Sequence, residues 1–242
     1  KALFDKICVY DVHMKGKLPM KKKVILLVLT GCIFLMGGCA SNAKETAEKE
    51  EISAEEAELE KNYDALNEKY INIEELPVFD MEVEKEYTSG DRTLTLEDSI
   101  ENELEYMIYK HYYDIISADF ESQMENIGGS ESFRIANQNE EKNFNEGRYM
   151  KEYAIHKLSV VEPEEIKKSL NTTKETLLAD IEECGLESYA LVKAEISWKY
   201  NEAALEAGPQ LPEGNYTRYY LLGDSKEEPE IKICQIYWDE FL

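Results

Sequence analysis

Residues 190–200 read Ala-Leu-Val-Lys-Ala-Glu-Ile-Ser-Trp-Lys-Tyr, and this stretch has the clearest pattern in the chain. Every even position carries an apolar or aromatic side chain, and every odd position except Leu191 is polar. A period of two residues places alternate side chains on opposite faces of a strand. The stretch therefore predicts a β-strand with one buried face and one face in water.

Two further strands are expected after this one. Gly208-Pro209 and residues 212–214 are typical of a loop. Residues 216–222 and 231–238 are rich in β-branched and aromatic residues and flank a wide polar loop at 223–229. We expect them to pair as an antiparallel hairpin.

A strand and a helix are expected before residue 190. Residues 149–161 indicate a strand that stops before Pro163, and proline suits the first turn of a following helix. That helix carries Ile166, can break near Asn171 and ends at Gly185.

The first helix of the domain is expected to begin near Thr95. Thr95 and Asp98 have the spacing of a capping box, with Asp in place of the usual Glu or Gln. Apolar residues and one histidine then recur at helical spacing on one arc: Leu96, Ile100, Leu104, Met107, Ile108, His111 and Ile115. A shorter helix is expected over 119–126, and Ser130 can cap a third after Gly128-Gly129.

This order of elements predicts an α+β domain in which N-terminal helices pack on a curved antiparallel sheet. The order and the closing runs at 219–222 and 232–238 resemble the NTF2-like (cystatin-like) domains of Gram-positive lipoproteins over residues 93–242. The resemblance implies a cone-shaped sheet that wraps a long helix and leaves a pocket. Members of that superfold include isomerases, dehydratases, transport adaptors and non-catalytic proteins, so the fold alone chooses no function.

Residues 20–38 are expected to be a targeting signal, not part of the folded domain. Residues 20–38 place three lysines before an apolar run of 13 residues, too short to span a bilayer, for which roughly 20 are needed. The run ends in Gly37-Gly38-Cys39 and resembles a bacterial lipoprotein signal, whose cysteine is lipidated. Cys32 is the alternative, but only six apolar residues would precede its motif.

The segments before and after this signal have different expected roles. We expect residues 1–19 to be a mistranslated leader, with Met20 as the true start. Residues 39–92 are expected to form an acidic, partly helical tether, since 44–60 alone holds eight glutamates and cannot bury enough surface to fold alone. The mature protein would then be anchored to the cell membrane by lipid, on the extracytoplasmic side.

The net charge and the absence of known site motifs argue against nucleic-acid binding and against several kinds of catalytic site. The formal net charge is −24, and the first 38 residues contribute seven lysines against two aspartates, so the remainder is more acidic still. Such a chain is repelled by nucleic acid. The sequence has no zinc-binding His/Cys motif, no phosphate-binding Gly-rich loop and no nucleophile elbow, so we expect no metal and no cofactor.

A few residues remain as site candidates. His111 on the helix arc is either a general base in an enclosed pocket or a core histidine. Tyr112, Tyr153, Trp198 and Tyr220 either line a ligand pocket or pack as core, and Tyr200 belongs with them. Cys184 and Cys234 either form a disulfide or remain buried thiols, since sequence cannot show their separation. The face of His156 is not assigned.

The leading hypothesis is a non-catalytic module that binds a small ligand or an envelope protein. One alternative is an NTF2-like enzyme of the isomerase or dehydratase type that uses His111. Another is a protein-interaction or inhibitor module of the cell envelope.

Overall fold

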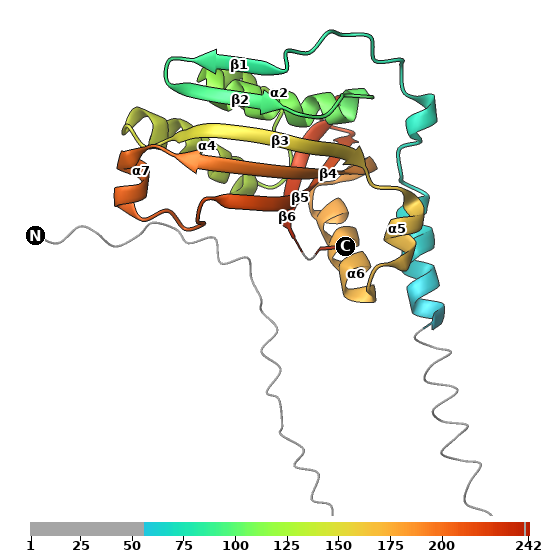
Figure 1. Cartoon of the computed structure of the whole chain (residues 1–242). Coiled ribbons are helices and arrows are strands. Elements are labelled where there is room, and N and C mark those ends of the chain that lie inside the picture. Colours follow the sequence, from blue (N-terminus) through green and yellow to red (C-terminus); the bar gives the residue numbers. More distant parts are fainter. Residues whose placement is uncertain (1–55, 240) are drawn as a thin grey trace, which may run out of the picture. The chain divides into compact units, whose positions relative to one another are not determined.

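Six strands lie side by side in chain order in the computed structural model, which describes residues 56–239 and 241–242 (Figure 1). The strands are β1 (Glu86–Ser89), β2 (Arg92–Leu96), β3 (Met150–Val160), β4 (Leu186–Tyr200), β5 (Gly214–Ser225) and β6 (Lys232–Trp238). The expected leader, the signal peptide, Cys32 and Cys39 lie outside the described residues.

Helices separate these strands along the chain. They are α2 (Glu103–Ser117), α3 (Phe120–Glu125), α4 (Glu131–Asn145), α5 (Pro163–Lys168), α6 (Asn171–Glu183) and α7 (Glu202–Ala207), with a short 3-10 helix at Ile73–Glu75 and a helical stretch at 56–67. Pro163 opens α5 and the Ser130 hydroxyl accepts a hydrogen bond from the Phe133 amide at the start of α4, as the sequence predicts. The α+β class is thus confirmed.

The expectation of a wholly antiparallel sheet is wrong at one junction. β2 runs parallel to β3, and the other neighbours are antiparallel. The chain leaves β2, passes through α2, α3 and α4, and returns to lay β3 beside β2. A parallel pair requires such a long crossover, so the sheet is mixed.

The expected start of the first helix is also wrong. Thr95 and Leu96 belong to β2, whose burial alternates from Arg92 to Leu96, and α2 begins only after Asn102. The Asn102 side chain accepts a hydrogen bond from the Glu105 amide at 3.0 Å, so it is the helix cap. Asp98 instead accepts from the Leu158 amide at 3.1 Å and ties the end of β2 to β3.

The expected boundary between tether and domain, at residues 92 and 93, falls inside the β1–β2 hairpin. The folded part also reaches further back. Leu66 is fully buried, and the Tyr70 hydroxyl donates to the Val161 carbonyl oxygen at 2.7 Å. Of the expected tether, residues 56–92 therefore contain segments that pack on the domain, because the few apolar residues of this acidic stretch find a surface there.

Helices cover both faces of the sheet and bury two hydrophobic cores. The first core lies between the sheet and α2, α3 and α4, and it contains the even-numbered positions of β4 from Ala190 to Trp198. The second lies under α5, α6 and the helical stretch at 56–67, and it contains Tyr189, Leu191 and Leu221. Leu191 breaks the alternation because both faces of β4 are buried at that point.

The loop between α3 and α4 runs along the outer edge of β6. The Gly128 amide donates to the Ile233 carbonyl oxygen at 2.9 Å, and the Ile233 amide donates to the Asn126 carbonyl oxygen at 2.9 Å. Gly129 lies so close to β6 that a Cβ atom there would be 2.3 Å from the Cys234 carbonyl oxygen. This close approach explains why the sequence has glycine at the position.

Candidate functional site

The candidate residues of the sequence gather on the face of the sheet that α2 covers. Tyr112 of α2 contacts Tyr153 of β3 with ring centroids 4.7 Å apart, and Tyr153 lies directly opposite Trp198 of β4. His111 packs edge-on against Tyr112 at 5.3 Å and against Tyr220 of β5 at 6.5 Å. All five side chains are buried. We call this group the inner cluster.

Two hydroxyl groups meet at the centre of the inner cluster. The hydroxyl oxygens of Tyr112 and Tyr220 are hydrogen-bonded to each other. Burial, together with the neighbouring phenol, keeps the pKa of Tyr112 well above its ordinary value. The Tyr112 hydroxyl therefore stays neutral at physiological pH, and the pair can donate one further hydrogen bond.

Arg218 of β5 completes the cluster, and sequence reasoning missed it. Its guanidinium carbon lies 4.8 Å from the ring centroid of Trp198 and 4.2 Å from that of Trp238. Its Nη1 lies 3.4 Å from the Tyr112 hydroxyl. The cation is thus held against two indole faces, an arrangement that stabilises a guanidinium through cation–π contact.

Hydrogen-bonding capacity in this region is left unused. Arg218 Nε and His111 Nδ1 are buried without a hydrogen-bond partner among the described residues. Trp198 Nε1 is buried too, and the Tyr200 hydroxyl is the polar group beside it. A buried polar group without a partner costs free energy, so Arg218 Nε and His111 Nδ1 make the inner cluster the candidate binding site.

The carboxyl group of Glu140, in α4, interacts electrostatically with Arg218. Burial raises the pKa of its carboxyl, and the positive charge of Arg218 opposes that rise only in part. Arg218 forms no ion pair with Glu140 or with any other carboxylate of the described residues. Charges removed from water are normally paired, so the N–H donors of this partly buried guanidinium lack the carboxylate partner that they would usually have.

His111 is poorly suited to act as a base. Burial, reinforced by the charge of Arg218, lowers the pKa of its imidazole to about 3. A general base works best when its pKa lies near the working pH. The imidazole stays neutral at pH 7 and accepts a proton only reluctantly, and this favours a structural role for His111.

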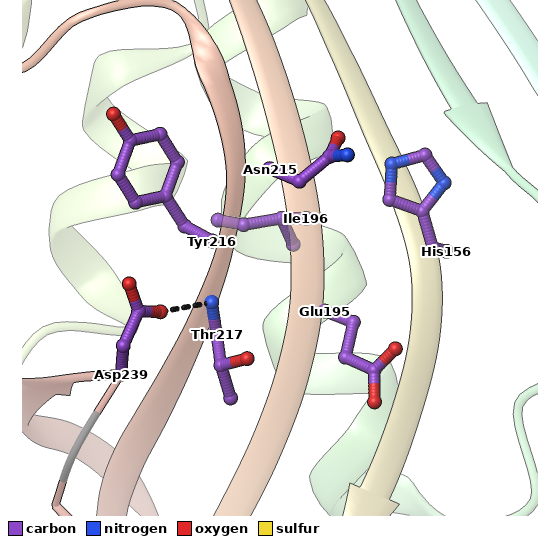
Figure 2. Close-up of a pocket in the computed structure, with 7 residues that line it drawn as sticks. All are labelled: His156, Glu195, Ile196, Asn215, Tyr216, Thr217 and Asp239. Atoms are coloured by element: carbon purple, nitrogen blue, oxygen red, sulfur yellow. Dashed lines mark hydrogen bonds between the residues drawn. The ribbon is translucent and has the colours of Figure 1, made fainter.

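The opposite, polar face of the sheet carries an open pocket of about 460 Å³ (Figure 2). His156 of β3 lies at one side of it, and Asp239, which accepts a hydrogen bond from the Thr217 amide, lies at the other. Glu195 and Asn215 line the floor between them. The structure thus assigns His156, whose face the sequence left open, to the outer face.

His156 is the middle of a hydrogen-bonded chain on that face. Its Nδ1 lies 2.9 Å from Glu97 Oε2, and its Nε2 lies 2.9 Å from Ser197 Oγ. The order acid, imidazole, hydroxyl is that of a hydrolytic triad. However, the Glu97 side chain is 55% exposed, and Ser197 lies mid-strand in β4 between two paired strands.

Backbone amides of a central strand are used in the ladder, so none is left at Ser197 to stabilise an oxyanion. The solvent around Glu97 also weakens its hold on the imidazole. We therefore interpret the chain as a cross-strand polar network that joins β2, β3 and β4.

The two cysteines meet at the other end of the sheet. Cys184 and Cys234 are free thiols in this structure, Cys184 packs against the second hydrophobic core to which Cys234 belongs, and each thiol shifts the pKa of the other. The structure therefore shows the proximity that the sequence could not.

Arg218 belongs to no catalytic motif, so motifs alone do not identify it. Its signal was nevertheless present: Tyr216, Arg218, Tyr220 and Leu222 alternate along β5, and the period of two places the arginine on the apolar face. A charged residue at such a position is costly and is found mainly where it serves a function.

Comparisons with protein-family models, with curated proteins and with solved structures found no match. Within residues 56–242, apart from residue 240, no group of three or more metal-ligating side chains is placed to hold a metal ion. In the same part of the chain, no helix has the length and apolar character needed to cross a membrane.

Proposed function

We propose that this protein is a lipid-anchored, extracytoplasmic binding module with an NTF2-like domain, and that it binds a small ligand bearing a carboxylate at Arg218. The observation that carries the proposal is the partly buried guanidinium of Arg218, whose Nε is inaccessible to solvent, and which has aromatic walls and no carboxylate partner among the described residues. Guanidinium groups bind carboxylates through two parallel hydrogen bonds. The unpartnered Nε of Arg218 is one of the donors that such binding uses.

The surroundings of Arg218 restrict the ligand further. Trp198 and Tyr216 stack at 4.2 Å, and Trp238 adds a half-exposed indole at the same end of the sheet. Such surfaces favour a flat or apolar body attached to the carboxylate. The raised pKa of Glu140 lessens the negative charge that a bound anion would face.

The NTF2-like assignment is supported by how the long helix sits. α2 buries Leu104, Ile108 and His111 on its inner side, and Tyr112 of the same helix belongs to the inner cluster. The resemblance implies a long helix in this position. The mixed sheet and the second helical layer are departures that the assignment has to accommodate.

The anchoring part of the proposal rests on residues 20–39. We expect a radioactive fatty acid to label the protein in cells, and Cys39→Ala to abolish the label. Cys32→Ala is the matched control and should leave the label in place. A label that survives Cys39→Ala and disappears with Cys32→Ala would move the anchor to Cys32.

The enzyme alternative loses support because His111 is a weak base in this environment. The envelope-interaction alternative keeps one supporting observation. Val78, Leu170 and Trp238 are apolar and exposed at 90%, 75% and 39%. They lie on separate segments, and isolated exposed apolar residues are common on protein surfaces, so we place this alternative second.

The chain has an internal reporter for the ligand proposal, because its only two tryptophans are Trp198 and Trp238, on either side of Arg218. We expect at least one member of a panel of aromatic and aliphatic carboxylates to change tryptophan fluorescence saturably. The matching neutral amide should have no effect.

Arg218→Gln should abolish the response, and Arg148→Gln, which changes a partly exposed arginine paired with Glu146 before β3, should preserve it. If no carboxylate binds, or if Arg218→Gln binds as well as the original protein, the proposed function is wrong.

A further inference from the structure

Two thiols lie where the end of α6 meets the edge strand β6. Cys184 is the C-cap residue of α6, and Cys234 lies in β6. Cys234 belongs to the second hydrophobic core and Cys184 packs against it. The junction is fixed independently one turn earlier in the helix, where Asp180 Oδ2 accepts a 2.6 Å hydrogen bond from the Tyr237 hydroxyl.

An irregularity in β6 directs Cys234 toward α6. In the pairing with β5, Gln235 lies opposite Leu221 and Ile233 lies opposite Leu222, so Cys234 is an extra residue. A bulge of this kind re-aims a side chain. In a regular strand Cys234 would share the face of Ile236, which packs on the first core; the bulge lets Ile233 enter that core while Cys234 joins the second.

The two thiols differ in access and in charge preference. Cys234 is 2% exposed, whereas Cys184 is partly exposed. The hydrogen bond from Cys234 is the main cause of a lowered pKa at Cys184, and the Ser130 amide at the start of α4 contributes. The same hydrogen bond, with burial, raises the pKa of Cys234. The Cys234 thiol also lies 3.4 Å from the Lys232 carbonyl oxygen, an alternative acceptor.

We propose that Cys184 and Cys234 are a thiol–disulfide exchange site, in which Cys184 reacts first with a low-molecular-weight disulfide and Cys234 then closes an intramolecular bridge. In the first step the Cys184 thiolate attacks one sulfur of the small disulfide and expels a thiolate. In the second step the Cys234 thiolate attacks the Cys184 sulfur of the mixed disulfide and expels the second thiolate. The protein loses two protons and two electrons, and the small disulfide is reduced to two thiols.

The two thiols differ in exposure and in pKa in the way that an attack by Cys184 before Cys234 requires. Exchange needs an accessible sulfur with thiolate character for the first attack, and Cys184 has both. The second attack needs proximity, which the contact between the side chains supplies. An extracytoplasmic protein also meets conditions in which a disulfide persists. The cysteine pair shares no residue with the candidate binding site at Arg218, so the exchange reaction does not depend on ligand binding there.

The test uses the full chain, reduced and purified in detergent, with oxidised glutathione as the probe. Samples are quenched by alkylation, digested and mapped by mass spectrometry, so that any cysteine other than Cys184 and Cys234 is followed separately. We expect the original protein to yield the linked peptides of Cys184 and Cys234. Cys234→Ser should stop at a glutathione adduct on Cys184, and Cys184→Ser should give at least tenfold less adduct on Cys234 over the same time.

A second measurement guards against variants that do not fold. Repeating the reaction of the original protein in denaturant should abolish the preference for Cys184 and should slow bridge closure relative to glutathione addition. Preferential reaction at Cys234 in the folded protein overturns the proposal. So does a folded protein in which glutathione adducts accumulate on Cys184 without a bridge.

Discussion

The hydroxyl pair of Tyr112 and Tyr220 offers a quantitative test of the inner cluster. Tyr112→Phe removes the partner of a fully buried Tyr220 hydroxyl and the 3.4 Å contact of Arg218, so we expect a loss of about 2 kcal/mol in the free energy of unfolding. Tyr220→Phe leaves the Tyr112 hydroxyl in contact with Arg218, and the expected loss is only about 1 kcal/mol.

The double variant decides whether the hydroxyls interact. If they do, each single variant already removes the shared bond, and the double variant should cost about 1 kcal/mol less than the sum of the two. Urea denaturation followed by tryptophan fluorescence and by circular dichroism gives the three values and checks that the transition is two-state. Tyr106→Phe is the control, because its hydroxyl forms no hydrogen bond with the described residues, and it should change stability by less than about 0.5 kcal/mol. Strict additivity, or a Tyr220→Phe variant that costs more than Tyr112→Phe, would refute the geometry of the cluster.

Four further outcomes can be measured with the same denaturation assay. Gly129→Ala should cost at least about 2 kcal/mol of unfolding free energy, because a φ of 74° and a close approach to β6 act together. Gly147→Ala is the control: its φ is 79° but the space around it is open, so it should cost only the backbone strain of about 1 kcal/mol. The pKa of His111 is about 3 in the folded protein against an ordinary value near 6.5, so below about pH 6.5 the unfolded chain takes up a proton that the folded protein does not. Stability should therefore fall as the pH is lowered from about 6.5, and His111→Gln should remove up to about 1.4 kcal/mol per pH unit of this slope. Leu66→Ala should cost about 2–4 kcal/mol and expose residues 56–92 to proteases, whereas an unchanged midpoint would restore the view of this segment as a free tether. Closing the bridge between α6 and β6 should stabilise the protein by up to about 4 kcal/mol, since it closes a loop of about 50 residues, and a reductant should reverse the gain.

The strands from residue 149 onward are predicted by the sequence because each has a local signal. Alternation marks β4, Pro163 ends β3, and glycine and proline bracket the last hairpin. These signals depend on neighbours within a few residues, and tertiary contacts leave them intact. The order of elements, and hence the α+β class, follows from them.

The first hairpin and the start of α2 could not be predicted in the same way. Leu96 and Ile100 continue the helical spacing of α2, so a helix pattern extends into residues that form β2. What decides between helix and strand there is the pairing of β2 with β3, more than fifty residues away. Only the structure contains that contact, and a window of sequence does not.

The candidate site was half predicted. The aromatic residues and His111 were identified from their positions on apolar faces, and the structure brings them together. Arg218 and Glu140 come from β5 and α4, which are separated by more than seventy residues, and neither belongs to a motif. Their relation is electrostatic and depends on burial, which exists only after the chain has folded.

The loop that lies along β6 has a consequence for how copies of this protein behave near one another. An open edge of a sheet can recruit a strand from another molecule and begin fibril growth. At β6 the outward amide and carbonyl of Ile233 are already used by Asn126 and Gly128. At the opposite edge β1 has only four residues. Copies of this protein at high local concentration are thus protected from pairing their edge strands with one another. A change that removes the loop from β6 should promote self-association before it unfolds the domain.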